Sequence, residues 1–332
     1  SFASKMLQKR RFGRVGLGVV MACLAEVSCT AAPCTAIEAA RNLVAPKMTK
    51  KKHGEFEGGD FWEKHEELLK QAWKEREPLH SGLYQYGPSF EEKYVHPSLR
   101  HAVEKAREGQ EREAFALFEE IVPGVFATDS LFTEHFLSEF LSEVDSINAS
   151  GIPTRRPNGM NRYGVILDEV GFEKMFEGLC KAYLQPLAAM LFPELVGPHD
   201  ADGHYAFTVK YEAEGDTELA KHGDAAVVTI NLCLGGTWEG SELRFFESGG
   251  SGMYQLPKGN ESAGAGDVVF RSGMALIHRG QHQHQAQELL SGQRVNMVIW
   301  LHSKDGVVRI APYAAEEQMT VAQRWRTHRF DL

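Results

Sequence analysis

The chain has 332 residues, and a hydrophobic fraction of 43% can build a packed core for one large domain with additions or for two domains. Its 36 basic and 45 acidic side chains give a net charge of −9, which argues against a general binder of nucleic acids or other polyanions. Outside the first 34 residues the cysteines are Cys180 and Cys233, too few for a disulfide framework. We expect both to be buried, unpaired thiols.

Residues 1–55 are predicted to be a leader, either a targeting segment or disordered. Basic side chains precede the apolar stretch Val15–Ala25, and small residues follow as far as Ala32. This is the layout of a secretory or organelle targeting signal, and the apolar stretch is too short to cross a membrane. Met48 is an alternative start, in which case we expect a cytoplasmic protein. No membrane span is expected in the body of the chain.

Residues 56–195 are predicted to form a helical region that supports the rest of the chain. Pro97 and Ser130 are start signals, and Pro123 and Pro193 lie just past the expected helix ends. Apolar residues recur at helical spacing in four stretches, which are Asp60–Glu77, Pro97–Ile121, Ser130–Ile147 and Val170–Leu191. These helices are expected to pack against the remainder of the chain and to carry no chemistry of their own.

Residues 196–315 have a different texture, with short β-branched or aromatic runs between glycine-rich turns. The expected strands are Tyr205–Tyr211, Val227–Leu234, Glu242–Phe246, Asp267–Phe270, Met274–His278 and Arg294–Leu301. Many short strands predict a mostly β protein with an α layer, whose core is a double-stranded β-helix, or jelly roll. Ser248–Gly266 is expected to be a mobile loop near a substrate, and residues 316–332 a C-terminal tail.

One constellation of side chains in the β-rich region suggests a metal site. His222 and Asp224 are one residue apart, so an extended segment presents both side chains on one face. A third ligand has to come from the segment that contains His278, His282 and His284. We predict His284 from its spacing to the arginine that follows, and His282 is its main rival. A continuous strand would put all three histidines on one side, although the glycine between the first two makes such a strand doubtful.

Two imidazoles and one carboxylate suit a facial iron site that leaves other positions open. Arg294, which begins an apolar strand, offers a planar fork for the carboxylate of a ligand. The hydroxyl groups of Tyr211 and Thr229 flank the His-Gly-Asp triplet and could bind the same ligand. The simpler alternatives are a surface hydrogen bond within the triplet, a surface ion pair for Arg294 and a packed core tyrosine.

These residues carry a resemblance to the Fe(II)- and 2-oxoglutarate-dependent dioxygenases, and more narrowly to the prolyl and lysyl hydroxylase-type domain and the "2-oxoglutarate and iron-dependent oxygenase domain" proteins. The resemblance spans roughly residues 157–301. Its motifs are Pro157-Asn-Gly-Met-Asn161, Tyr163-Gly-Val-Ile-Leu167, Phe207-Thr-Val-Lys-Tyr211, His222-Gly-Asp224, Thr229-Ile-Asn-Leu-Cys-Leu-Gly235, Glu239-Gly-Ser-Glu-Leu243, His278-Arg-Gly280, His284 and Ser291-Gly-Gln-Arg294.

The resemblance implies that His222, Asp224 and His284 bind Fe(II) and that Arg294 forms a salt bridge with the distal carboxylate of 2-oxoglutarate. Tyr211 is similar to a family tyrosine that helps to hold this cosubstrate. The implied reaction is hydroxylation of a prolyl or lysyl side chain, coupled to decarboxylation of 2-oxoglutarate to succinate, with L-ascorbate as reductant. A protein or peptide substrate is expected, a small molecule is possible, and no nucleic-acid partner is expected.

Two departures from the family pattern affect the expected substrate more than the expected iron site. Gly223 stands where related proteins often have a bulkier residue, and Glu288-Leu289 replaces a proline-containing turn. Two other functions remain open. One is a cupin-like enzyme that uses another divalent metal, and the second is a non-catalytic binding module on the same fold. The sequence does not predict the oligomeric state.

Overall fold

The computed structural model describes residues 35–45, 59–197, 199–246, 265–311 and 314–320, all within one compact unit that begins at Thr35. Most of the predicted leader lies outside these residues. Its described part contains α1 (Ala36–Arg41), where Thr35 and Glu38 form a reciprocal capping box, so this segment is helical. Across the described ranges, we find no helix with the length and apolar character needed to cross a membrane.

Helices form in each of the four stretches where the sequence predicts them, but several of their boundaries differ from the prediction. The elements of the helical region are α2 (Gly59–Glu75), η1 (Ser81–Leu83), α3 (Pro88–Tyr94), α4 (Pro97–Arg107), α5 (Glu111–Phe115), α6 (Glu134–Ala149), η2 (Asp168–Val170), α7 (Glu173–Leu179), the π-helical η3 (Cys180–Leu184) and α8 (Gln185–Leu191). The predicted helix Pro97–Ile121 is wrong beyond Arg107. Gly109 adopts a left-handed φ of 75°, which ends α4, and the chain then forms α5 and a strand.

Two other helix starts lie later than predicted. The α6 helix begins after Thr133 rather than at Ser130, because the Thr133 hydroxyl accepts a hydrogen bond from the Phe136 amide at 3.3 Å. Gly171, with a φ of 103°, separates η2 from α7, and α7, η3 and α8 then continue to Leu191 as predicted.

Two antiparallel sheets form the β core, and the predicted jelly roll is confirmed. The larger sheet has the order β1-β2-β8-β5-β10-β3 and the smaller one β4-β9-β6-β7. The strands are β1 (Glu119–Val122), β2 (Val125–Thr128), β3 (Gly203–Glu212), β4 (Leu219–His222), β5 (Val228–Gly240), β6 (Leu243–Phe245), β7 (Gly266–Val268), β8 (Ala275–Arg279), β9 (His284–Ala286) and β10 (Leu289–His302), and a separate hairpin contains β11 (Val307–Ala311) and β12 (Ala314–Thr320).

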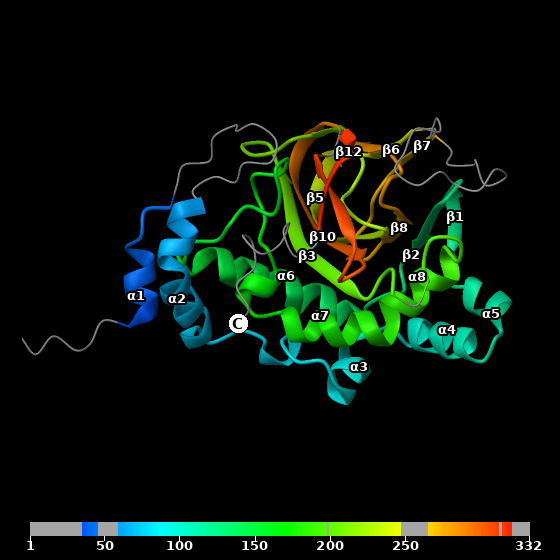
Figure 1. The fold of residues 1–332 in the computed structure, drawn as a ribbon, viewed down its shortest axis with the longest axis horizontal. Coiled ribbons are helices and arrows are strands. Elements are labelled where there is room, and N and C mark those ends of the chain that lie inside the picture. The colour runs from blue at the N-terminus through cyan, green and yellow to red at the C-terminus, as the bar shows by residue number, and fades with distance from the viewer. Residues whose placement is uncertain (1–34, 46–58, 198, 247–264, 312–313, 321–332) are drawn as a thin grey trace, which may run out of the picture. The chain divides into compact units, whose positions relative to one another are not determined.

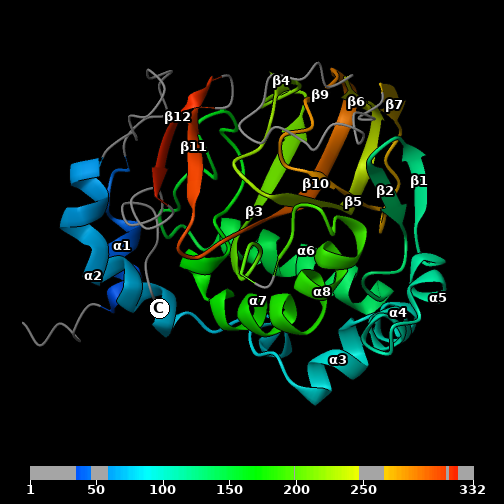
Figure 2. The same cartoon turned by 45° about the vertical axis from the view of Figure 1, so that its right-hand side comes forward.

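The larger sheet has two different apolar faces because side chains alternate along each strand. In β5, Ile230 and Leu232 belong to the core that the sheet shares with the helices, whereas Cys233 belongs to the core between the two sheets. Helices α6, α7 and α8 lie along the outer face of this sheet, and the smaller sheet lies beyond its inner face (Figure 1; Figure 2). The inner face therefore lines the interior of the barrel.

The structure adds strands that the sequence pattern did not predict. β1 and β2 come from the predicted helical region, and β2 pairs with β8, so this region contributes to the barrel itself. β12 occupies the start of the predicted tail. The segment predicted as a mobile loop, Ser248–Gly266, lies outside the described residues except for its last two positions, where β7 begins at Gly266.

Candidate metal centre

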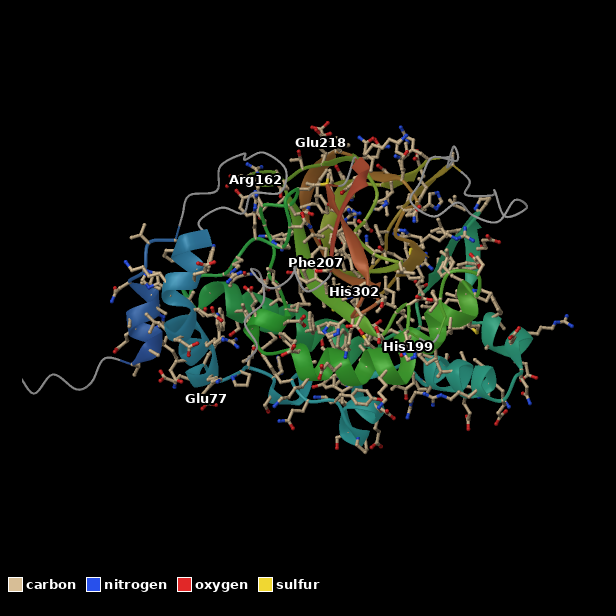
Figure 3. All side chains as sticks on the ribbon, in the orientation of Figure 1. Glu77, Arg162, His199, Phe207, Glu218 and His302 are labelled. Atoms are coloured by element: carbon tan, nitrogen blue, oxygen red, sulfur yellow. The ribbon has the colours of Figure 1, made fainter. Side chains whose placement is uncertain are left out.

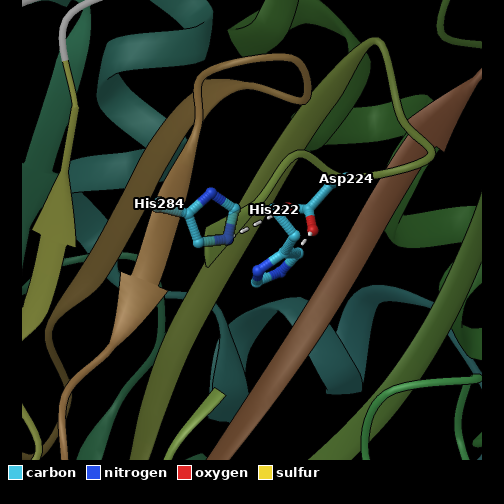
Figure 4. A group of neighbouring side chains, drawn as sticks. All are labelled: His222, Asp224 and His284. Atoms are coloured by element: carbon cyan, nitrogen blue, oxygen red, sulfur yellow. Dashed lines mark ion pairs between the residues drawn. The ribbon is translucent and has the colours of Figure 1, made fainter. Parts of the chain in front are cut away.

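His222, Asp224 and His284 meet where the smaller sheet approaches the larger one. His222 is the last residue of β4, and its register partner across the ladder is His284, the first residue of β9. The backbone amide of Asp224 donates a hydrogen bond of 2.6 Å to the carbonyl of Gly280, which fixes the short link after β4. Two segments that are distant in sequence therefore direct three polar side chains at one point (Figure 4).

The three side chains have the composition and spacing of a metal site. One potential ligand atom from each lies within 4.8 Å of the others, and the residues are only 6%, 5% and 4% exposed. The Nε2 atom of His222 lies 3.5 Å from one oxygen of Asp224, and Nε2 of His284 lies 3.7 Å from the other. The structure thus brings together the three residues that the sequence predicted as ligands.

Backbone carbonyl groups orient both imidazole rings. Nδ1 of His222 lies 2.8 Å from the carbonyl oxygen of Ala220, and Nδ1 of His284 lies 2.9 Å from that of His282. A carbonyl oxygen can only accept, so each Nδ1 carries the donated proton and each Nε2 keeps its lone pair. This is the tautomer that a metal-binding histidine needs, with its second nitrogen anchored.

The charges at the cluster favour the forms that bind a cation. Burial lowers the pKa of His284 to about 3, despite the opposing effect of Asp224. Burial alone would raise the pKa of Asp224, but His284 and His222 together hold it well below its usual range. At neutral pH the centre therefore presents a neutral His284 imidazole and an ionised Asp224 carboxylate.

Thr229 and His278 support this cluster from the inner face of the larger sheet. The Thr229 hydroxyl donates a hydrogen bond of 2.7 Å to the Asp224 carboxylate. The sequence analysis had instead predicted that this hydroxyl contacts a cosubstrate. His278 is opposite Thr229 in the β5–β8 ladder, and its ring centroid lies 4.9 Å from that of His284.

The rival histidine, His282, lies outside the cluster. Its Nε2 atom is 3.2 Å from the carbonyl oxygen of Phe246, and its ring packs against Phe245 with centroids 4.9 Å apart. The turn at Gly280 breaks the strand that would have placed the histidines side by side, because β8 ends at Arg279 and β9 begins at His284. His284 therefore faces the barrel interior with the other two cluster residues, and His282 does not join them.

Arg294 lies on the inner face of β10, opposite Tyr211 of β3, and is only 1% exposed. One terminal nitrogen donates to the carbonyl of Ser241, and the guanidinium carbon lies 5.1 Å from the Tyr211 ring centroid and 4.8 Å from that of Phe270. Among the residues that the structure describes, Nε of Arg294 has no hydrogen-bond partner and no carboxylate is within ion-pair distance. A buried guanidinium without a counter-ion suits an anionic ligand.

Sequence reasoning missed two buried polar residues, one beside this arginine and one beside Tyr211. Ser241 is fully buried, adopts a φ of 62° and has a hydroxyl without a partner in the described part of the chain. Asn161 is 2% exposed and lies beside Tyr211. Both belong to motifs that carried the resemblance, but no spacing rule pointed to their side chains.

A jelly roll with a buried pair of histidines and one carboxylate has the form of a non-haem iron oxygenase. The chain belongs to the family of 2-oxoglutarate and iron-dependent oxygenase domain-containing proteins, as its relatives show. The relative from Danio rerio, "2-oxoglutarate and iron-dependent oxygenase domain-containing protein 2", is 30% identical to this chain. The match covers 74% of this chain and 68% of the relative's length. Residues 73–197 match the family described as the OGFOD2-like domain.

The other comparisons are more partial. The relative of the same name from Xenopus tropicalis is 35% identical over 58% of this chain. The chain spans only 53% of that relative's length. Human "Procollagen-lysine,2-oxoglutarate 5-dioxygenase 1" is 24% identical over 65% of this chain and 28% of its own length. A solved Pseudomonas putida prolyl-4-hydroxylase has a TM-score of 0.40 and 12% identity, covering 62% of this chain and 98% of its own.

Proposed function

We propose that this protein is a 2-oxoglutarate-dependent iron dioxygenase in which His222, Asp224 and His284 bind Fe(II) and Arg294 binds 2-oxoglutarate. The observation that carries the proposal is the pairing of a buried ligand trio with a buried arginine that forms no ion pair with any described residue of the same barrel. The trio alone would suit several divalent metals. The Arg294 guanidinium, which has no carboxylate partner in the described part of the chain, favours a ligand that carries a carboxylate.

The side chains act by holding the reactants and excluding water. The anchored Nδ1 atoms keep both imidazole rings in the metal-binding tautomer, and Thr229 fixes one oxygen of Asp224. Arg294 pairs with the distal carboxylate of 2-oxoglutarate, with Tyr211 against the same ligand. When bound, Fe(II) supplies the chemistry that couples decarboxylation of 2-oxoglutarate to succinate with hydroxylation of a substrate carbon.

The proposed substrate is a prolyl or lysyl side chain in a protein or peptide. Support for this class comes from the similarity to a relative whose name denotes a procollagen-lysine dioxygenase, and from the motifs shared with prolyl and lysyl hydroxylase-type domains. A small molecule is the second substrate class. L-Ascorbate is the proposed reductant that keeps the iron in its ferrous form.

An anaerobic titration with Fe(II) and 2-oxoglutarate tests the proposal directly. We expect a visible charge-transfer band from the chelated keto acid in the wild-type protein and no band in Asp224→Ala, because the carboxylate ligand is then missing. In air, the wild-type protein should convert 2-oxoglutarate to succinate faster than Asp224→Ala. A screen of proline- and lysine-containing peptides then identifies the substrate by a mass gain of one oxygen atom.

Two outcomes would support the alternatives. Tight binding of zinc or manganese with no keto-acid band in the iron-loaded protein would favour a cupin-like enzyme with another metal. A band without any succinate, together with retained binding of a protein partner, would favour a non-catalytic module. Either result would overturn the proposed dioxygenase.

A further inference from the structure

The segment before the barrel, residues 157–167, runs beside β3 and is called the strap below. It extends the ladder of the larger sheet, because the amides of Thr208 and Lys210 donate to the carbonyls of Val165 and Tyr163 at 2.9 and 3.1 Å. Arg162 of the strap lies at the end of the barrel far from the helices, whereas His302 lies near them (Figure 3). The strap therefore borders the end of β3 that contains Tyr211.

The orientation of the Asn161 side chain within the strap is fixed by Asn158. The Asn158 amide nitrogen donates to Oδ1 of Asn161 at 3.0 Å, and Oδ1 of Asn158 accepts from the Asn161 backbone amide at 2.8 Å. The Nδ2 atom of Asn161 is therefore turned away from Asn158. It is buried and, apart from the neighbouring Tyr211 phenol, has no hydrogen-bond partner among the described residues.

Asn161 is linked to Arg294 through the Tyr211 ring. Burial raises the pKa of the Tyr211 phenol, while the Arg294 charge and the Asn161 amide both oppose that rise, as expected of groups beside the phenol oxygen. Arg294 lies over the same ring and touches Ser241. We call these four residues, Asn161, Tyr211, Ser241 and Arg294, the carboxylate cradle.

Three members of the cradle have buried polar atoms for which the described residues outside the cradle supply no partner, namely Nδ2 of Asn161, Nε of Arg294 and the hydroxyl of Ser241. Burying a donor without an acceptor costs free energy, and such groups concentrate where a ligand supplies the acceptor. Two of the three groups are obligate donors, and the third can donate. A carboxylate, which offers only acceptors, fits this arrangement.

We propose that Asn161 is a positioning residue for the cosubstrate, whose amide donates to the distal carboxylate of 2-oxoglutarate beside Arg294 and orients Tyr211 against it. This inference rests on the proposed function. In the proposed function the ligand trio, and not Asn161, would hold the metal-chelating end of the keto acid. Asn161 therefore distinguishes dicarboxylate from monocarboxylate keto acids.

Binding of keto acids to the Mn(II)-loaded protein under anaerobic conditions tests the inference without turnover. Asn161→Leu should weaken the binding of 2-oxoglutarate by about tenfold, which is the effect of losing one hydrogen bond to a charged group. It should leave the weaker binding of 2-oxobutyrate unchanged, because that keto acid lacks the distal carboxylate. Asn161→Ser, which is less disruptive to packing, should repeat this selective loss.

Tyr205→Phe is the matched control, because it removes the strap's hydrogen bond of 2.8 Å to the Pro157 carbonyl and leaves the cradle intact. Its affinity for 2-oxoglutarate should equal that of the wild type. Equal 2-oxoglutarate affinity in wild type and both Asn161 variants would overturn the inference while leaving the proposed function in place. Equal weakening of both keto acids would also overturn it, as a merely structural effect. Failure of the wild type itself to bind 2-oxoglutarate would overturn the proposed function.

Discussion

The hydroxyl of Thr229 contributes to the candidate metal centre through Asp224, to which it donates a hydrogen bond. Thr229→Val keeps the shape of the side chain but leaves that carboxylate oxygen without its donor. We expect a loss of about 10- to 100-fold in Mn(II) affinity, the usual effect of removing a partner of a metal ligand. Titration followed by electron paramagnetic resonance measures this loss. Thr229→Ser should restore most of the affinity. Wild-type Mn(II) affinity in Thr229→Val would show that the hydrogen bond has no part in metal binding.

His282 and His284 provide a paired test of the ligand assignment. His284→Ala should abolish Mn(II) binding, because Nε2 of His284 points at Asp224. His282→Ala should retain it, because the Nε2 atom of His282 is engaged by the carbonyl of Phe246. The same titration measures both variants. Equal losses in the two variants would contradict the assignment of His284 alone.

Because of Cys233, the free energy of unfolding should depend on pH in the alkaline range. Burial raises the pKa of its thiol from 9.0 to about 11, although the Arg294 charge opposes the rise. Between these values the unfolded chain ionises first, so the contribution of Cys233 to the free energy of unfolding falls as pH increases, by about 1.4 kcal/mol per pH unit. Denaturant unfolding at pH 8 and pH 10.5 should show a smaller decrease in Cys233→Ala than in the wild type. Equal decreases would exclude this thiol as the cause.

At the scale of elements, the link between β8 and β9 depends on Gly280. A Cβ atom at this position would lie 2.1 Å from the carbonyl oxygen of Ala226, and the Gly280 carbonyl itself accepts from the Asp224 amide. Gly280→Ala should therefore displace the backbone on which Asp224 is held, lowering both the melting temperature and Mn(II) affinity. Gly87→Ala is the control, because a Cβ there meets nothing within 4 Å. Wild-type affinity in Gly280→Ala would show that the loop adjusts freely.

The sequence predicts the long elements of this fold better than the short ones. The periodic runs that form α2 and β3 are placed to within two residues at each end, because each repeats its pattern over several residues. The run Arg294–Leu301 lies within β10, which begins five residues earlier than predicted, at Leu289. β4 and β9 have too few residues to show a period, although they carry His222 and His284. β1 overlaps the end of a predicted helix, and β2 lies in the short stretch between two predicted helices. β2 was not predicted because its pairing partner in the barrel, β8, is distant in the sequence.

At the scale of the whole molecule, the predicted site residues come together because the barrel has a defined inside. The alternation in β5 and β10 puts Thr229 and Arg294 on the face opposite to Ile230 and Ile299. A sequence pattern can predict this division between faces. It could not predict that Asn161 meets Tyr211, because the strap joins β3 through backbone hydrogen bonds that leave no periodic signal.

The shared core of helices and strands predicts that the described unit unfolds in one step. Phe140 of α6 is fully buried in the same cluster as Ile230 and Ile299 of the larger sheet. Phe140→Ala should lower the free energy of unfolding by about 3–5 kcal/mol, and the helices and the metal centre should still be lost together. Leu79→Ala, at a residue that is 58% exposed, should have little effect. Far-ultraviolet circular dichroism and Mn(II) release should give coincident denaturant transitions, whereas release of Mn(II) well after loss of the helical signal would mean that the barrel is stable without its helical layer.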